Sequence, residues 1–145
     1  EEGVSPRHIV LEITGLDNVQ GDFGLEKQIK KLRDAGFTIS LDDYGTGYAS
    51  MKHFVENLFD NVKIDGRLLK KAETRKGHMV LKKNIELLKS FDLPVVQEGV
   101  ETIEELREAV KLGANRLQGY FFLHPSTKED FIDYLDTYTP INYKD

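Results

Sequence analysis

The chain has 145 residues, a length that fits one domain with a buried hydrophobic core. Its hydrophobic share of 39%, its charged share of 31% and its net charge of -5 exclude a disordered chain and disfavour duplex nucleic acid as a partner. The sequence contains no cysteine, which excludes disulfide bonds and thiolate zinc sites, so the fold must depend on packing.

Membrane and targeting segments are not expected in this chain. Its apolar runs fall well short of the ~20 residues that a helix needs to cross a bilayer, and its first residues do not resemble a signal peptide. We therefore expect a cytoplasmic protein. Because the chain lacks an initial methionine and soon enters a strand pattern, we also expect an upstream regulatory segment or the remaining part of the domain.

Five short apolar runs alternate with helical patterns along the chain. The predicted strands cover residues 8–14, 37–43, 61–65, 95–98 and 116–122. Helical spacing of apolar residues follows each strand, over residues 24–35, 49–58, 76–90, 103–112 and 127–135. Thr102 and Glu105 have the spacing of a capping box, and Ser126 is the expected N-cap of the last helix. Residues 141–145 are expected to be a loose tail.

This alternation predicts an α/β fold with parallel strands. Right-handed crossovers between parallel strands lead either to an open doubly wound sheet or to a closed eight-fold barrel. Five βα units cannot close an eight-fold barrel alone. In either fold, the polar residues at the ends of the strands gather at one rim of the sheet, where β/α enzymes keep their chemistry.

Adjacent Asp42 and Asp43 are the sharpest signal at this rim. Neighbouring side chains point to opposite faces within a strand, but they can converge where the strand breaks into a loop. Two carboxylates close together repel, and magnesium or manganese, which prefer hard oxygen ligands, would relieve that repulsion. The alternative is that Asp43 only caps the following turn. Glu12, Glu98 and Glu101 add further carboxylates at the same end of other strands.

Lys63 alternates with Val62 and Ile64 in the third strand. If those two residues face the helices, Lys63 points to the interior of the barrel, where a buried ammonium needs an anion. It would then fix a phosphate or the attacking water. The alternative is a structural salt bridge to Asp65.

Two further groups are candidates for substrate binding. Gly45, Thr46 and Gly47 provide a flexible backbone whose N–H groups a phosphate can approach, although a short Gly-x-Gly is more often a tight turn. Gln118 offers a neutral amide that can read a base or an amide edge.

Five motifs together resemble the EAL domain family, bacterial phosphodiesterases that open cyclic di-GMP to linear pGpG within a TIM-type barrel. They are Leu11-Glu12-Ile13-Thr14, the segment from Asp42 to Tyr48, Val62-Lys63-Ile64-Asp65, the segment from Glu98 to Thr102, and Leu117-Gln118-Gly119-Tyr120, in the order and spacing of that family. The resemblance implies a partial TIM-type (β/α) barrel in which residues 1–140 supply five of the eight βα units, the fourth through the eighth.

The resemblance also implies roles for single residues. Glu12, Asp42, Asp43 and Glu98 would hold two divalent ions, Mg²⁺ or Mn²⁺. Lys63 would position the water or the phosphate, Glu98 would also belong to the general-base cluster, and Glu101 would support it. Gln118 would lie near the bound cyclic di-GMP. The Glu-Ala-Leu motif that names the family and a metal-binding asparagine belong to upstream strands that this chain does not contain.

Two other functions compete with this one. Gly15 stands where active relatives commonly carry a glutamate that steadies the Asp-Asp loop, which favours a degenerate domain that binds cyclic di-GMP or a protein partner without hydrolysis. An unrelated divalent-metal β/α enzyme, such as an enolising aldolase or epimerase, is the third possibility. An incomplete barrel also exposes sheet edges, so we expect self-association as a homo-oligomer, or disorder.

Overall fold

A computed structural model describes residues 3–14, 23–46 and 51–141. Its sheet contains five parallel strands in the order β1-β2-β3-β4-β5, which is also their order along the chain. The strands are β1 (Val10–Ile13), β2 (Thr38–Tyr44), β3 (Asn61–Ile64), β4 (Val95–Gln97) and β5 (Arg116–Leu117). The predicted α/β class with parallel strands is therefore confirmed.

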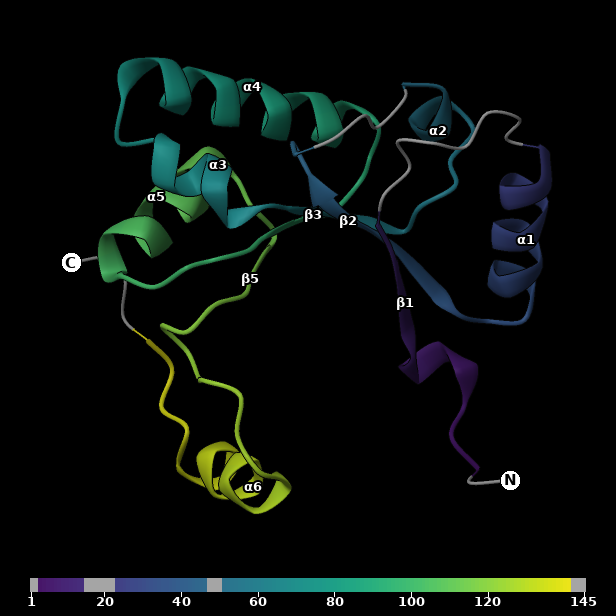
Figure 1. The fold of residues 1–145 in the computed structure, drawn as a ribbon. Coiled ribbons are helices and arrows are strands. Elements are labelled where there is room, and N and C mark those ends of the chain that lie inside the picture. The colour runs from purple at the N-terminus through teal and green to yellow at the C-terminus, as the bar shows by residue number, and fades with distance from the viewer. Residues whose placement is uncertain (1–2, 15–22, 47–50, 142–145) are drawn as a thin grey trace.

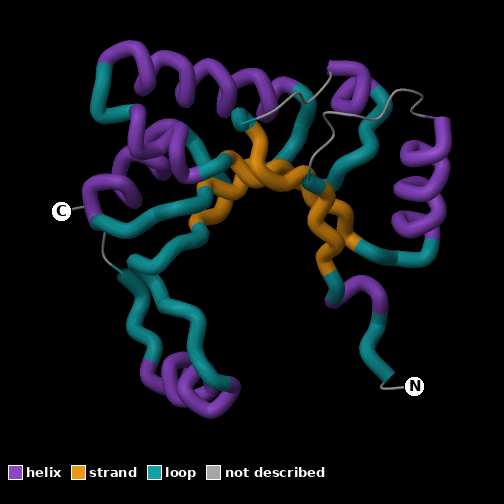
Figure 2. The backbone as a smooth tube through the Cα atoms, viewed as in Figure 1, coloured by secondary structure: helices purple, strands orange, loops and turns teal. Residues whose placement is uncertain are grey.

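Helices alternate with the strands, and most of them cover one side of the sheet (Figure 1). They are the 3₁₀ turn η1 (Pro6–His8), α1 (Phe23–Asp34), α2 (Met51–Val55), α3 (Gly66–Lys71), α4 (Arg75–Ser90), α5 (Ile103–Leu112) and α6 (Lys128–Thr137). Figure 1 shows α1 to α5 along the outer side of the sheet, with α6 standing apart. The strands in Figure 2 form a curved wall, open on the side away from these helices, as expected for five βα units of a TIM-type barrel.

The hydrophobic core lies between the sheet and its helices. Ile39, Val62 and Val95 of the strands are fully buried against Ile85 and Leu88 of α4. Each such side chain contributes about 1.5–3 kcal/mol through burial. Because strand side chains alternate, the positions between them point to the inner side of the curve.

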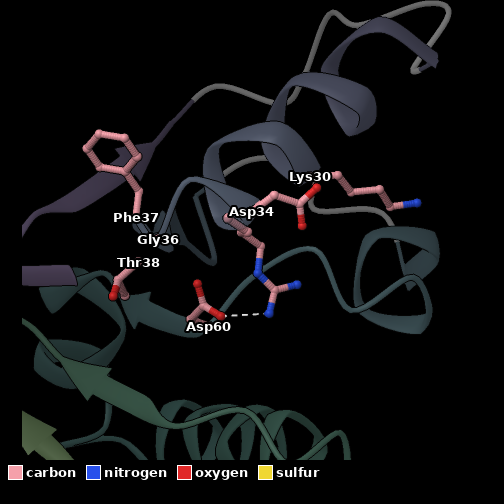
Figure 3. Close-up of a pocket in the computed structure, with 7 residues that line it drawn as sticks. Lys30, Asp34, Gly36, Phe37, Thr38 and Asp60 are labelled. Atoms are coloured by element: carbon pink, nitrogen blue, oxygen red, sulfur yellow. Dashed lines mark hydrogen bonds and ion pairs between the residues drawn. The ribbon is translucent and has the colours of Figure 1, made fainter. Parts of the chain in front are cut away.

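The far end of the barrel wall, where the strands begin, is fixed by a charged pair. Arg33 of α1 lies 2.7 Å from Asp60, and Asp60 accepts the backbone N–H of Ile39 at 2.8 Å. Arg33 and Asp60, the latter labelled in Figure 3, both line a cavity of about 400 Å³. Because Asp60 binds both Arg33 and the backbone of Ile39, it fixes the starts of β2 and β3. The candidate site residues lie at the opposite rim, where the strands end.

The end of the predicted fifth strand is wrong. The ladder stops at Leu117 instead of residue 122, because the chain turns where Phe122 donates its N–H to the Gly119 carbonyl at 3.2 Å. Gly119 packs closely against the loop that follows β4, so that an added Cβ would lie 2.0 Å from the Val100 carbonyl oxygen. Such an approach between distant segments forces the backbone out of the sheet.

Local signals near two helices also differ from expectation. The N-cap of α6 is Thr127, whose hydroxyl accepts the N–H of Asp130, and Ser126 does not cap it. The predicted capping box of α5 is confirmed, with Thr102 and Glu105 bonding each other's backbone. Helix α3 was not predicted, because six residues are too few for a periodic pattern.

Within the described ranges, no helix has the length and apolar character required to span a membrane.

Candidate metal and phosphate site

Lys63 is the centre of a cluster at the rim where the strands end. Its Nζ lies 2.8 Å from Glu12 Oε1, 3.2 Å from Asp42 Oδ1 and 2.8 Å from Glu98 Oε1. The three carboxylates come from β1, β2 and the residue after β4, so the sheet brings together groups that are distant in sequence. Only 6% of Lys63 is exposed. As the alternation predicts, its side chain points away from the helices.

The charge of Lys63 is strongly stabilised. Burial alone would lower its pKa, but its close contacts with the carboxylates of Glu12, Glu98 and Asp42 outweigh burial and raise the pKa above the ordinary value. Asp65, the alternative partner, is instead paired with Arg67 at 2.9 Å. Lys63 is therefore a permanent cation held by three carboxylates.

A second grouping consists of carboxylates alone. One oxygen each from Asp42, Asp43 and Glu98 lie within 4.8 Å of one another. The register of β2 shifts between Leu41 and Tyr44, and Asp43 has a left-handed φ of 54°. This irregularity lets the neighbouring carboxylates converge. Aspartate is one of the residues that tolerate such a backbone angle.

The electrostatics of this grouping favour an added cation. Burial raises the pKa of Glu98, and the charges of Asp42 and Asp43 add to this against the lowering effect of Lys63. Partial desolvation, followed by repulsion from Asp42 and Asp65, raises the pKa of Asp43. Asp42 Oδ1 is buried and makes an ion pair with Lys63 but no directed hydrogen bond within the described part of the chain.

The donor set fits a hard divalent ion. Asp42, Asp43 and Glu98 offer carboxylate oxygens that Mg²⁺ or Mn²⁺ would neutralise. Glu12 is bound to Lys63 and lies outside this three-residue grouping, although it shares the same ammonium. The sequence predicted all four as metal ligands, and the geometry brings three of them together directly and the fourth through Lys63.

The other predicted site residues divide into three cases. Gln118 lies at the cluster, where its Nε2 donates to Glu98 Oε1 at 3.3 Å. Glu101 points elsewhere and pairs with Lys70 at 2.8 Å. Gly45 and Thr46 form a tight turn, in which the Thr46 hydroxyl donates to the Asp43 carbonyl at 3.0 Å.

Two residues singled out in the sequence cannot be placed. Gly47 of the predicted phosphate loop and Gly15, the departure from the family pattern, lie outside the described residues. Gln97 had no predicted role, yet it is fully buried beside the cluster. Its signal in the sequence is a polar side chain within an otherwise apolar strand.

Comparison with known proteins gives one consistent result. The model of the EAL domain family matches residues 1–125. The chain is 31% identical over 140 residues to the oxygen sensor protein DosP of Escherichia coli (strain K12), covering 96% of this chain and 18% of DosP. It is 28% identical over 130 residues to the cyclic di-GMP phosphodiesterase RocR of Pseudomonas aeruginosa, covering 89% of this chain and 33% of RocR. The chain thus spans a third or less of these relatives.

Solved structures agree in fold. The PaMucR phosphodiesterase in complex with cyclic di-GMP superposes with a TM-score of 0.81 at 28% identity, covering 88% of this chain and 52% of that one. A manganese and cyclic di-GMP complex of BlrP1 from Klebsiella pneumoniae gives a TM-score of 0.75 at 27% identity, covering 85% of this chain and 32% of that one. Because the family model accounts for residues 1–125 of the 145, this chain belongs to the EAL domain family.

Proposed function

We propose that residues 1–140 are the C-terminal part of a phosphodiesterase domain that hydrolyses cyclic di-GMP to pGpG with two divalent ions, Mg²⁺ or Mn²⁺. The observation that carries this proposal is the convergence of Lys63 with Glu12, Asp42 and Glu98 at the rim of an EAL-type sheet. A relative named as a cyclic di-GMP phosphodiesterase and neighbours solved with cyclic di-GMP support the choice of substrate.

Each residue of the cluster has a task in this reaction. Asp42, Asp43 and Glu98, joined by Glu12, would hold the ions. When bound, divalent ions neutralise the phosphodiester and activate water for attack. Lys63 keeps its proton and orients the phosphate or the water, because its pKa is raised above the ordinary value. Glu98 also belongs to the general-base cluster that accepts a proton from the attacking water.

The remaining residues contact the substrate or support the cluster. Gln118 places an amide beside Glu98, within reach of a nucleotide bound at the rim. Gly45, Thr46 and Gly47 stay the candidate phosphate loop of this proposal, and the structure describes the first two of them. Glu101 supports the loop after β4 through its pair with Lys70, at some distance from the carboxylate grouping.

The direct test supplies cyclic di-GMP and Mn²⁺ to the natural polypeptide that contains this chain, with chromatography of the products. We expect one of the two phosphodiester bonds to be cleaved and pGpG to accumulate, and Lys63→Met to abolish this. The matched control is Lys83→Met, which removes a similarly short but exposed ion pair with Glu86 on α4. Tight binding of cyclic di-GMP without any pGpG would contradict the phosphodiesterase and establish a receptor.

The second function is that receptor, a degenerate domain that binds cyclic di-GMP or a protein partner without hydrolysis. Gly15 favours it, because a glutamate at that position steadies the Asp-Asp loop in active relatives. Gly15→Glu in the same natural polypeptide separates the two functions. A large rise in pGpG formation at unchanged affinity for cyclic di-GMP supports the receptor as the natural state, whereas full activity before the substitution contradicts it.

A further inference from the structure

Gln97 is a fully buried amide directly behind the carboxylate cluster. It ends β4 and is in register with Ile64 of β3, so both side chains point to the helix-covered side of the sheet. Lys63 and Glu98 neighbour these two residues in sequence, and the side chain of Lys63 points to the other side. Gln97 therefore acts on the cluster only through the backbone.

The amide of Gln97 joins two backbone segments. Its Nε2 donates to the Ile64 carbonyl at 3.2 Å and to the Glu98 carbonyl at 3.0 Å. Ile64 directly follows Lys63, and its carbonyl also accepts the N–H of Glu98 at 3.0 Å. The Gln97 amide thus links the backbone just after Lys63 to the backbone of Glu98. The link lies on the helix-covered side of the sheet, opposite the 2.8 Å ion pair of Lys63 and Glu98.

This tie lies where the chain leaves the sheet. Gly99 has a φ of 67°, and the ladder to β5 continues with the Val100 N–H, which donates to Gln118 at 3.1 Å. The Glu98 peptide between them turns out of the regular ladder. A rotation of that peptide would swing the Glu98 carboxylate away from Lys63, and the Gln97 donor opposes such a rotation.

The arrangement also has a cost. Gln97 Oε1 is buried and finds no hydrogen-bond partner among the residues that the structure describes. A methionine of similar length would fill the same space without an unsatisfied oxygen, so packing alone favours an apolar side chain here. The Nε2 donor is the feature that an apolar residue lacks.

We propose that Gln97 is a positioning residue, whose Nε2 fixes the Glu98 backbone to β3 and so holds the Glu98 carboxylate ready for a divalent cation. The identity of the bound cation rests on the proposed function. The positioning itself is a property of this chain without any ligand.

The experiment uses the natural polypeptide that contains this chain, and compares the unmodified chain within it with Gln97→Met, which keeps the volume, and Gln97→Ala, which does not. Gln28→Met, at an exposed glutamine of α1, is the matched control. Three quantities are measured: Mn²⁺ affinity by titration calorimetry, amide hydrogen exchange at Glu98 and Val100 without metal, and the midpoint of urea unfolding.

We expect Gln97→Met to bind Mn²⁺ about tenfold more weakly, as for other residues that orient metal ligands, and to exchange its Glu98 amide faster. Its urea midpoint should equal or exceed that of the unmodified chain, because the unsatisfied oxygen is gone. Gln97→Ala should lose a similar factor in affinity at a lower midpoint, since it leaves a cavity. Gln28→Met should match the unmodified chain throughout.

Unchanged exchange at Glu98 in Gln97→Met would overturn the positioning role, as would an affinity loss that follows the urea midpoint across the variants. Failure of the unmodified chain to bind Mn²⁺ would count against the proposed function instead. In that case the exchange rates at Glu98, which need no metal, still decide the role of Gln97.

Discussion

Gly66 and Gly99 meet backbone to backbone at the rim, where a Cβ added to either residue would lie 2.8 Å from the Cα of the other. A Cβ on Gly66 would also lie 3.2 Å from the Glu98 carbonyl oxygen. The close approach of these two glycines therefore sets the distance between the loop after β3 and the loop after β4. Those loops carry Asp65 and Glu98, so the spacing of the site depends on glycine, which has no side chain, at both positions.

Gly66→Ala should consequently destabilise the chain, by about 1–3 kcal/mol, because the added methyl group pushes on backbone that cannot move aside. Urea unfolding measures this loss. Gly24→Ala is the matched control: an added Cβ there meets nothing within 4 Å, and alanine in a helix is favoured over glycine by up to about 1 kcal/mol. Equal effects of the two substitutions would contradict the close approach.

Lys63→Met should destabilise the chain far more than an ordinary loss of an ion pair. It leaves Glu12, Asp42 and Glu98 without their shared cation. Removal of one partner from a fully buried ion pair costs about 3–5 kcal/mol, which is an upper limit here because Lys63 is buried but Glu12 is exposed. Lys70→Met removes a pair with Glu101 that is exposed on both sides and should cost at most about 1 kcal/mol. Thermal unfolding of the two variants side by side gives the comparison.

Millimolar Mn²⁺ adds a second readout on Lys63→Met. Because a divalent ion supplies the positive charge that the variant lacks, the metal should restore part of the lost stability. A variant that unfolds at the same temperature with and without Mn²⁺ would argue that the remaining carboxylates do not bind the metal.

Asp65 provides a prediction of pH dependence. Its hydrogen bond with Arg67 holds the pKa of the Asp65 carboxyl below its ordinary value, so this group stabilises the folded state above the pKa of the unfolded chain, about 3.9. The contribution disappears as the pH falls through the lower pKa of the folded state. Asp65 also caps α3, where its carboxylate accepts the Arg67 N–H at 2.7 Å.

Asp65→Asn keeps the capping oxygen and removes the charge. We expect it to be less stable than the unmodified chain at pH 7, by up to about 1 kcal/mol, and equally stable once the pH is well below 3.9. Urea midpoints measured from pH 7 downward test this, with Asp136→Asn on the exposed side of α6 as a control for net charge. A difference that grows in acid would mean that the sign is wrong.

The sequence predicted the centre of the candidate site because its signals are local and periodic. Alternation around Lys63 placed this residue on the inner face, and carboxylates at the ends of parallel strands must share a rim. The convergence of Asp42 and Asp43 depends on a register shift in β2 that no local pattern reveals.

Contacts between distant segments explain why the end of β5, the position of Glu101 and the role of Gln97 were not predicted from the sequence. β5 ends early because Gly119 packs on the backbone of Val100, and Glu101 turns to Lys70 on α3, a helix too short to be seen in the sequence. The buried amide of Gln97 looked like one polar residue among many, because its two carbonyl acceptors are set by the pairing of β3 with β4.

We expect self-association through the apolar surface at the two ends of the barrel wall. At the β1 edge Val4 and Val10 are 60% and 52% exposed, and α6 buries none of its residues while Phe131 and Leu135 are 47% and 56% exposed. Unpaired strand edges and apolar helix faces of this kind bind other copies of a chain. Light scattering should therefore show a mass that rises with concentration, and Phe131→Glu with Leu135→Glu should reduce it. A constant monomer mass over a hundredfold range of concentration would show that these surfaces do not associate.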